Sequence, residues 1–178
     1  NVEAAPAKGE VYTIAFVPRT KKSVIAEGIS PVELGRLYFT KGENADDVKI
    51  GIERASSKPV FSTTPLKLNQ TYLVVLRYEV NAGGDNVYLY VNPTDFNKVP
   101  DFTAANAVID GVNHTGNSVG NYGLQGIELR QGSNKTLTAP VMYVASLRVS
   151  DTYPGLFGGA GEDKTPKLSV SKKSFILG

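Results

Sequence analysis

Short segments in which apolar and polar residues alternate, or in which a few apolar residues follow one another, occur along most of the chain. They are rich in β-branched and aromatic residues and are separated by Gly, Asn, Asp or Pro, which is the pattern of strands and turns. The expected strands cover residues 11–17, 35–41, 48–54, 59–68, 72–80, 86–92, 106–110, 125–132 and 141–151. Their spacing of roughly 8–12 residues is typical of an all-β sandwich or barrel. We therefore expect an all-β protein, built as a two-sheet antiparallel β-sandwich.

The clearest hairpin is expected between Thr71 and Pro93, in the sequence TYLVVLRYEVNAGGDNVYLYVNP, where a Gly-Gly-Asp-Asn break separates two strands. Side chains alternate between the two faces of a strand, so each strand here has one apolar or aromatic face and one mixed face. The apolar faces carry Tyr72, Val74, Leu76, Tyr78 and Val80 on the first strand and Val87, Leu89 and Val91 on the second. The mixed faces carry Leu73, Val75, Arg77 and Glu79, and Tyr88, Tyr90 and Asn92. We expect the apolar faces to pack inward and the mixed faces to be partly solvated.

Composition narrows the class of protein and of partner. The 178 residues fit one large domain, or one domain and a fragment of another. The formal net charge is +2 and the basic residues are scattered, so we expect no nucleic-acid partner. Cysteine is absent, which excludes disulfides and thiolate metal sites. No apolar run approaches the roughly 20 residues of a membrane helix, so we expect no membrane span.

The end of the chain changes character. We expect one domain over residues 1–157, a Gly-rich linker over 158–166 (GGAGEDKTP) and a terminal strand over 167–178 (KLSVSKKSFILG). This last strand is too short to bury itself, so we interpret it as the start of a following domain. The alternative is a terminal strand that folds back onto the same domain.

Several segments together carry a family resemblance: the 71–93 hairpin, GRLYFTK with VKIGIERASS, GIELRQGSN, and VASLRVSDTYPGLF. Over residues 11–157 the chain resembles the laminin-G-like, concanavalin A-type jelly-roll domains of Bacteroidetes surface and secreted proteins. The resemblance implies a jelly roll, an extracellular or cell-surface location, and a role in carbohydrate binding or adhesion. The tail PKLSVSKKSFILG resembles the first strand of the immunoglobulin-like repeats that follow such domains.

The chain departs from these relatives at two places. They carry an Asp before the LRV-type strand, where this chain has Ser146. They also begin with one or more strands upstream, whereas this chain starts almost directly at the segment 11–17. A missing strand would leave an open sheet edge, which another part of the molecule or a partner would complete.

Enzymatic chemistry finds little support in the residues. Glycoside hydrolases of this fold place paired acids at alternate strand positions, Glu-x-Asp-x-x-Glu. The segment GIELRQG offers Glu128 alone, for which we expect a structural ion pair with Arg130, and the adjacent Asp46–Asp47 lie in a loop. His114, the single histidine, is expected to be an exposed loop residue. We therefore expect no enzyme, and we keep a glycoside hydrolase as a third hypothesis.

Calcium is the one cofactor that the resemblance brings in, because such sandwiches often hold this ion with carboxylate, amide and carbonyl oxygens at loop ends. The candidate ligands are Asp85 and Asn86 in the GGDN turn and Asp110 in the segment IDGVNHTGN. The alternative is that these side chains cap the backbone of their own turns.

Sugar binding needs flat aromatic faces with polar partners. The chain has no Trp but has 9 Tyr residues. The candidates are Tyr122, with Asn121 and Asn113 in the same loop, and the strand residues Tyr88 and Tyr90. For the last two, the alternative is packing between the sheets with their hydroxyls at the rim.

These observations favour a non-catalytic, lectin-like binding or adhesion module of a bacterial cell-surface or secreted protein, with glycan as the ligand class. The partner would be a glycan or another surface protein. The alternative is a structural module that a neighbouring domain or chain completes by strand addition. That alternative predicts an unpaired sheet edge beside residues 11–17, or a swapped strand at 167–177.

Overall fold

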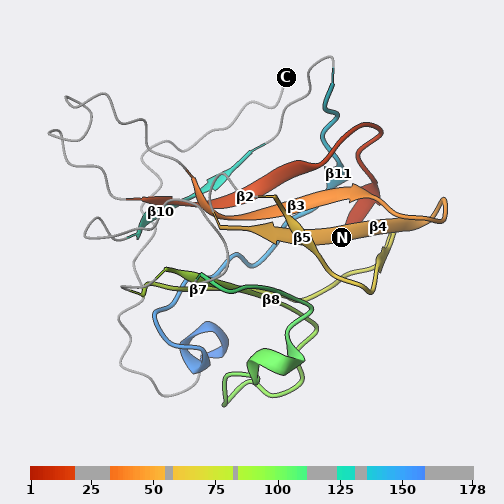
Figure 1. The fold of residues 1–178 in the computed structure, drawn as a ribbon. Helices are drawn as coiled ribbons and strands as arrows, with labels where there is room; N and C mark the ends of the chain where they lie inside the picture. The colour runs from red at the N-terminus through yellow and green to blue at the C-terminus, as the bar shows by residue number, and fades with distance from the viewer. Residues whose placement is uncertain (19–32, 55–57, 82–83, 112–123, 131–135, 159–178) are drawn as a thin grey trace, which may run out of the picture. The chain divides into compact units, whose positions relative to one another are not determined.

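The computed structural model describes residues 1–18, 33–54, 58–81, 84–111, 124–130 and 136–158 (Figure 1). The chain divides into two compact units, one of Asn1–Pro93 with Asp101–Val144 and one of Thr94–Pro100 with Ala145–Gly178. Within the described residues the regular structure is strand, apart from two 3-10 turns, η1 (Phe102–Ala104) and η2 (Pro154–Phe157). The all-β prediction is therefore confirmed. The expected terminal strand at 167–178 and most of the expected linker lie outside the described residues.

The first unit contains antiparallel sheets that match a β-sandwich. The larger sheet has the order β10 (Leu124–Leu129), β2 (Val11–Pro18), β3 (Leu34–Lys41), β4 (Asp47–Glu53) and β5 (Val60–Phe61), with β6 (Leu66–Lys67) also paired to β4. The smaller sheet has the order β7 (Val74–Glu79), β8 (Asn86–Val91) and β9 (Ala107–Ile109). A separate pair joins β1 (Val2–Ala4) to β11 (Val141–Met142).

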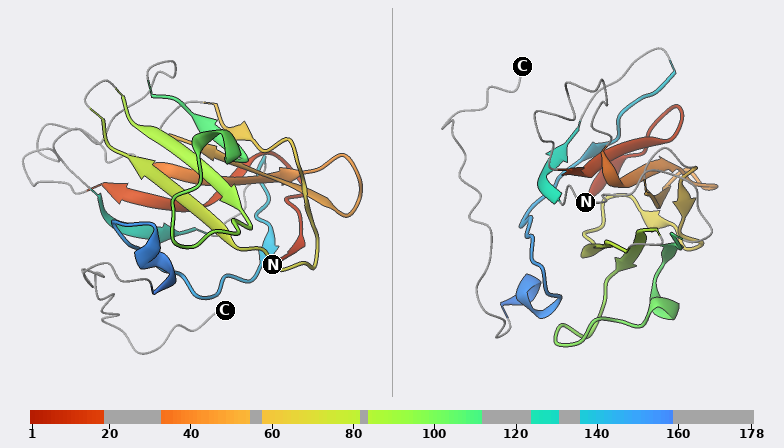
Figure 2. Two further views of the ribbon diagram at one scale, coloured as in Figure 1. Left: turned by 90° about the horizontal axis from the view of Figure 1, so that it is seen from below. Right: turned by 60° about the vertical axis from the view of Figure 1, so that its left-hand side comes forward.

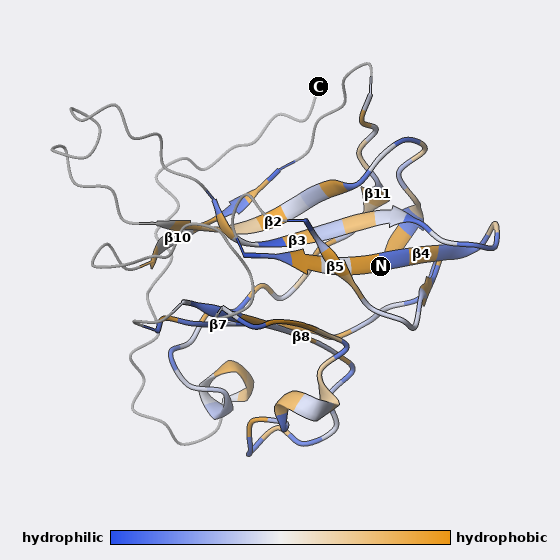
Figure 3. Ribbon diagram, in the orientation of Figure 1, coloured by the Kyte–Doolittle hydropathy of each residue, from blue (hydrophilic) through white to orange (hydrophobic). Residues whose placement is uncertain are grey.

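The hydrophobic core lies between the two larger sheets, which lie one over the other in Figures 1 and 2. Its fully buried side chains, all 0% exposed, are Val48, Ile50 and Ile52 of β4, Val87 and Leu89 of β8, and Ile109 of β9. Figure 3 shows hydrophobic residues along β8 and in the middle of β4. Each such side chain contributes about 1.5–3 kcal/mol by leaving water, so this layer holds the two sheets together.

The hairpin expected at 71–93 is present as β7 and β8. The two strands are antiparallel, and Leu76 lies opposite Leu89 on the face that packs into the core. On the other face Arg77 lies opposite Tyr88, and Glu79 lies opposite Asn86. The division of the hairpin into an inward apolar face and a mixed outer face is therefore confirmed.

Two of the expected strands are wrong in extent. The segment 59–68 is two short strands, because Ser62 makes a turn in which its Oγ accepts from the amide of Thr64 and donates to its carbonyl, at 3.2 and 2.9 Å. The segment 141–151 is a strand only at Val141–Met142. Ser146 has a φ of 55°, in the left-handed region, so an extended strand cannot continue through it.

The start of the chain also differs from expectation. A strand does precede residues 11–17: β1 pairs with β11, with Val2 opposite Met142 and Val2 buried in the core. In addition, β2 lies inside its sheet, between β10 and β3, so the edge that strand addition predicted beside 11–17 does not exist.

The described residues of the second unit contain a small aromatic cluster and no strand. Tyr153 is buried, and its hydroxyl donates to the carbonyl of Asp95 at 2.8 Å. The ring of Phe157 lies 5.2 Å from that of Tyr153 and 4.6 Å from that of Phe96. Rings at such separations attract one another beyond their area burial, which stabilises the short η2 turn.

Candidate functional site

The outer face of the smaller sheet carries a cluster of aromatic and charged side chains, here called the β8 cluster: Arg77, Glu79, Asn86, Tyr88 and Tyr90. The rings of Tyr88 and Tyr90 are stacked, with centroids 6.5 Å apart and planes 21° apart. The guanidinium of Arg77 lies 5.3 Å from the centroid of the Tyr88 ring. Both predicted tyrosines thus lie on the face away from the core and not between the sheets, so the alternative of packing between the sheets is wrong.

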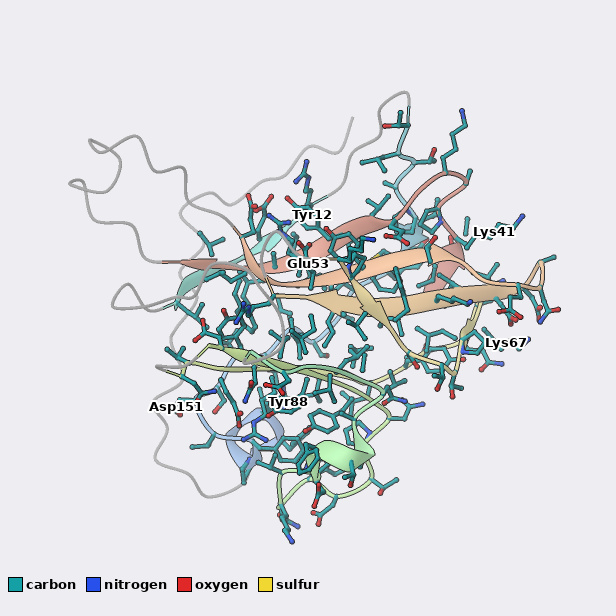
Figure 4. The ribbon with its side chains drawn as sticks, viewed as in Figure 1. Tyr12, Lys41, Glu53, Lys67, Tyr88 and Asp151 are labelled. Carbon is teal, nitrogen blue, oxygen red and sulfur yellow. The ribbon has the colours of Figure 1, made fainter. Side chains whose placement is uncertain are left out.

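Hydrogen bonds within the β8 cluster connect most of its polar groups. The Glu79 carboxylate accepts from the hydroxyl of Tyr88 at 3.0 Å and from Nδ2 of Asn86 at 3.2 Å, and it pairs with Arg77. Partial burial, followed by the hydrogen bond to Glu79, raises the pKa of Tyr88. Tyr90 is only 2% exposed. Of the two rings, Tyr88, which Figure 4 labels, is therefore the one that is partly exposed to solvent.

The predicted calcium ligands lie at the turn between β7 and β8. Asp85 is 0% exposed, and its carboxylate accepts from the amide of Asn81 at 2.9 Å and from the hydroxyl of Tyr78 at 2.7 Å. Oδ1 of Asn86 accepts from the amide of Gly111 at 2.8 Å, and Asp110 is partly buried. Within the described ranges no group of three or more His, Asp or Glu side chains could hold a metal ion. Calcium binding stays a prediction.

A second aromatic surface, which the sequence pattern did not predict, lies on the outer face of the larger sheet. Tyr12 of β2 lies opposite Tyr38 of β3, which lies opposite Gly51 of β4, which lies opposite Phe61 of β5. Directly opposed residues of an antiparallel sheet share a face, so Tyr12, Tyr38 and Phe61 form one row across four strands. We call it the aromatic row. The first two rings are 5.6 Å apart, and all three side chains are partly exposed.

Gly51 gives the aromatic row its shape. A Cβ at this position would lie 2.6 Å from Cδ1 of Phe61 and 2.8 Å from the carbonyl oxygen of Val60. The Phe61 ring therefore lies against the bare backbone of Gly51, where any other residue would push it away. The same contact covers a strand glycine and so stabilises the sheet, as an aromatic ring across from glycine commonly does.

Two arginines flank the Tyr12 end of the row. The guanidinium carbons of Arg36 and Arg130 lie 4.8 and 4.5 Å from the centroid of the Tyr12 ring, and Nη1 of Arg130 donates to the Tyr12 hydroxyl. Arg36 also pairs with both oxygens of Glu53, at 3.1 and 3.3 Å, and with Glu33 at 3.1 Å. Tyr12 and Glu53 are labelled in Figure 4.

The electrostatics of this end follow from burial and pairing. Burial alone would lower the pKa of Arg36, but its attraction to Glu53 and the hydrogen bonds to that carboxylate outweigh this effect, so the pKa is raised. Burial, then the hydrogen bond with Glu53, raises the pKa of Tyr38 well above its ordinary value. Both groups keep their protons at physiological pH, so the aromatic row carries neutral phenols beside fixed guanidinium charges.

The remaining predicted site residues are not brought together here. Tyr122, Asn121, Asn113 and His114 lie in the segment 112–123, outside the described residues. The expected ion pair of Glu128 with Arg130 is not found among the ion pairs of the described residues, because the Arg130 side chain turns to Tyr12 instead. A signal for the aromatic row existed in the alternation of Arg36 and Tyr38 within GRLYFTK, but its partners come from other strands, whose register the sequence does not state.

Comparison of the chain with protein-family models, with curated proteins and with solved structures finds no match. In the part of the chain that the structure describes, no helix has the length and apolar character needed to cross a membrane.

Proposed function

We propose that this protein is a non-catalytic, lectin-like binding or adhesion module of a bacterial cell-surface or secreted protein, with glycan as its ligand class. The observation that carries the proposal is the aromatic row of Tyr12, Tyr38 and Phe61 across β2 to β5. The resemblance to laminin-G-like and concanavalin A-type domains supports the same class of function, though a shared fold hosts many functions.

The dimensions of the row suit a short oligosaccharide. Neighbouring strands lie about 4.8 Å apart, so a row that crosses four strands extends for roughly 15 Å. Aromatic rings offer flat apolar surface for the C–H faces of sugar rings, and tyrosine adds a hydroxyl for their hydroxyl groups. Arg36 and Arg130 supply further donors beside the Tyr12 ring.

The carboxylates near the row support binding without hydrolysis. Glycosidases need two carboxyl groups that face the scissile bond, at about 5–9.5 Å from each other. Glu53 is 2% exposed and holds Arg36 with both oxygens, so it offers no free carboxylate to a bound sugar. Glu33 accepts a hydrogen bond from the same guanidinium at 3.1 Å, so its carboxylate is also engaged.

The test is a glycan array probed with the intact chain, with and without added calcium. We expect binding that Tyr12→Ala abolishes and that Tyr143→Ala preserves, because Tyr143 is 67% exposed at the end of β11 and is not part of the row. Tyr88→Ala and Tyr122→Ala test the β8 cluster and the 112–123 loop. Binding that survives Tyr12→Ala but not one of these two would move the site to that surface, and a silent array would reject glycan binding.

A structural or assembly module remains the second candidate. One observation favours it: among the described strands, β10 pairs only with β2, and its residues Leu124 and Leu129 are 39% and 59% exposed. A strand added there would cover these side chains and complete the backbone hydrogen bonds of the edge. Size-exclusion chromatography with light scattering, at several concentrations, tests for such assembly.

A further inference from the structure

We infer that Arg130 makes the aromatic row selective for acidic saccharides, those that carry a carboxylate or sulfate group. The inference rests on the proposed glycan binding and names the ligand class of the same site. It comes from the way in which this one guanidinium is held and from the charges that surround it.

Arg130 is fixed at both ends of its side chain. Its backbone amide donates to the carbonyl of Thr13 at 2.7 Å, which anchors the residue at the end of β10. Its guanidinium lies 4.5 Å from the Tyr12 ring centroid and donates through Nη1 to the Tyr12 hydroxyl. The residue is nevertheless exposed. A guanidinium that is oriented before binding loses less conformational entropy for each hydrogen bond that it forms with a ligand.

Of the two arginines at the Tyr12 end of the row, Arg130 is the one that makes no ion pair with a described residue. Arg36 contacts the same ring, but its charge is met by Glu53 and Glu33 at 3.1 Å each. No carboxylate of the described residues lies within 4.0 Å of the Arg130 guanidinium, and Glu128, two residues earlier on β10, makes no ion pair with it. Among the described residues, no close carboxylate therefore compensates the outward positive charge beside Tyr12.

The shape of the group indicates which ligand it fits. A guanidinium presents its donors in a planar fork that matches two oxygens of a carboxylate or a sulfate, and such charge-assisted bonds are about twice as strong as neutral ones. A sugar ring stacked on Tyr38, next to the Tyr12 ring that Arg130 covers, would carry an acidic substituent toward that fork. A neutral sugar offers this fork only hydroxyl oxygens, whose hydrogen bonds to it are weaker than those of a carboxylate or a sulfate.

The experiment compares an acidic saccharide with its neutral ester, and adds a sulfated saccharide as a second acidic ligand. Isothermal titration calorimetry of the intact chain uses tetragalacturonate, its fully methyl-esterified form and a sulfated galactan tetrasaccharide. We expect the acid or the sulfate ester to bind at least about tenfold more tightly than the methyl ester. Arg130→Gln removes that preference, Arg130→Lys restores part of it by returning the charge without the fork, and raising the salt concentration weakens it.

The outcomes separate this inference from the function on which it rests. Preference for the carboxylate or for the sulfate, lost in Arg130→Gln, supports it and shows which group is recognised. Equal binding of acid and methyl ester overturns it while glycan binding stands. If none of the three ligands binds but neutral sugars bind on the array, this inference is also overturned. If none of the three binds and the array is silent, both proposals are rejected. If Arg130→Gln does not fold, the comparison of acid with ester on the native chain still decides.

Discussion

The ion pair between Arg36 and Glu53 gives the sharpest stability prediction, and the perturbation is Glu53→Gln. The Glu53 side chain is 2% exposed and that of Arg36 is 14% exposed, and the two residues lie opposite each other in the β3–β4 register. Nε of Arg36 is already buried without a hydrogen bond among the described residues. The substitution removes the negative charge and leaves the partly desolvated cation with Glu33, 30% exposed, as its remaining carboxylate among the described residues.

The size of the expected destabilisation follows from what happens when a buried ion pair loses only one partner. Removing one partner of such a pair typically costs about 3–5 kcal/mol, because the remaining charge is buried without compensation. Since Glu33 still contacts Arg36 after the change, we expect the lower end, about 3 kcal/mol of the free energy of unfolding. This is a large part of the roughly 5–15 kcal/mol that stabilises a typical protein.

Urea denaturation followed by circular dichroism measures the effect. With an m-value of about 2–3 kcal/mol per molar urea, the loss lowers the midpoint by about 1–1.5 M. The control is the double variant Arg36→Met with Glu53→Met, which removes both charges and keeps apolar volume, and should be less destabilised than Glu53→Gln. A midpoint for Glu53→Gln within about 0.3 M of the native value, or a double variant as unstable as the two single losses added together, would refute the reasoning.

Further changes test other contacts. Gly51→Ala should lower the free energy of unfolding by about 1–3 kcal/mol, because the new methyl group would lie 2.6 Å from Cδ1 of Phe61. The control is Gly126→Ala, which has no atom within 4 Å of the new methyl group and should leave the thermal midpoint unchanged. Burial and the hydrogen bond to the Asp85 carboxylate raise the pKa of Tyr78. The folded state therefore keeps a proton that the unfolded state releases at about pH 10. Stability should be intact below about pH 10 and fall above it, and urea midpoints of Tyr78→Phe should depend less on alkaline pH. The hydrogen bond from Lys67, followed by that from the Asn44 side chain, lowers the pKa of Asp47. Lys67→Gln should therefore raise the pKa of Asp47 toward its ordinary value in a carboxyl NMR titration. An unchanged pKa would contradict the contact.

The local sequence pattern was sufficient to predict a structural element whose interactions all lie within one short segment. The β7–β8 hairpin could be predicted with its two faces, because alternation and the Gly-Gly-Asp-Asn break lie within Thr71–Pro93. Alternation failed where a backbone conformation interrupts it. The apolar pattern of 141–151 continues through Ser146, but the left-handed φ of that residue ends any extended strand.

The candidate site shows the same division. Tyr88 and Tyr90 could be placed on one face of one strand from the sequence, and they are on one face. Their exposure could not be predicted, because burial depends on everything packed around a residue, and Tyr90 is 2% exposed. The Gly-Gly-Asp-Asn turn was a reasonable place to look for calcium, but the sequence does not show that Tyr78 and Asn81 donate to Asp85.

The sequence by itself determined the class of fold, most strand positions, and which face of each strand is apolar, since these depend on residue type and on a period of two. Only the tertiary structure decided which strands are neighbours. Arg130 meets Tyr12 across 118 positions of the chain because β10 pairs with β2, and Phe61 meets Gly51 because β5 pairs with β4. Such pairings follow from the burial of a shared core and from strand register, which no local stretch of the chain contains. The aromatic row and its arginine are therefore properties of the sheet.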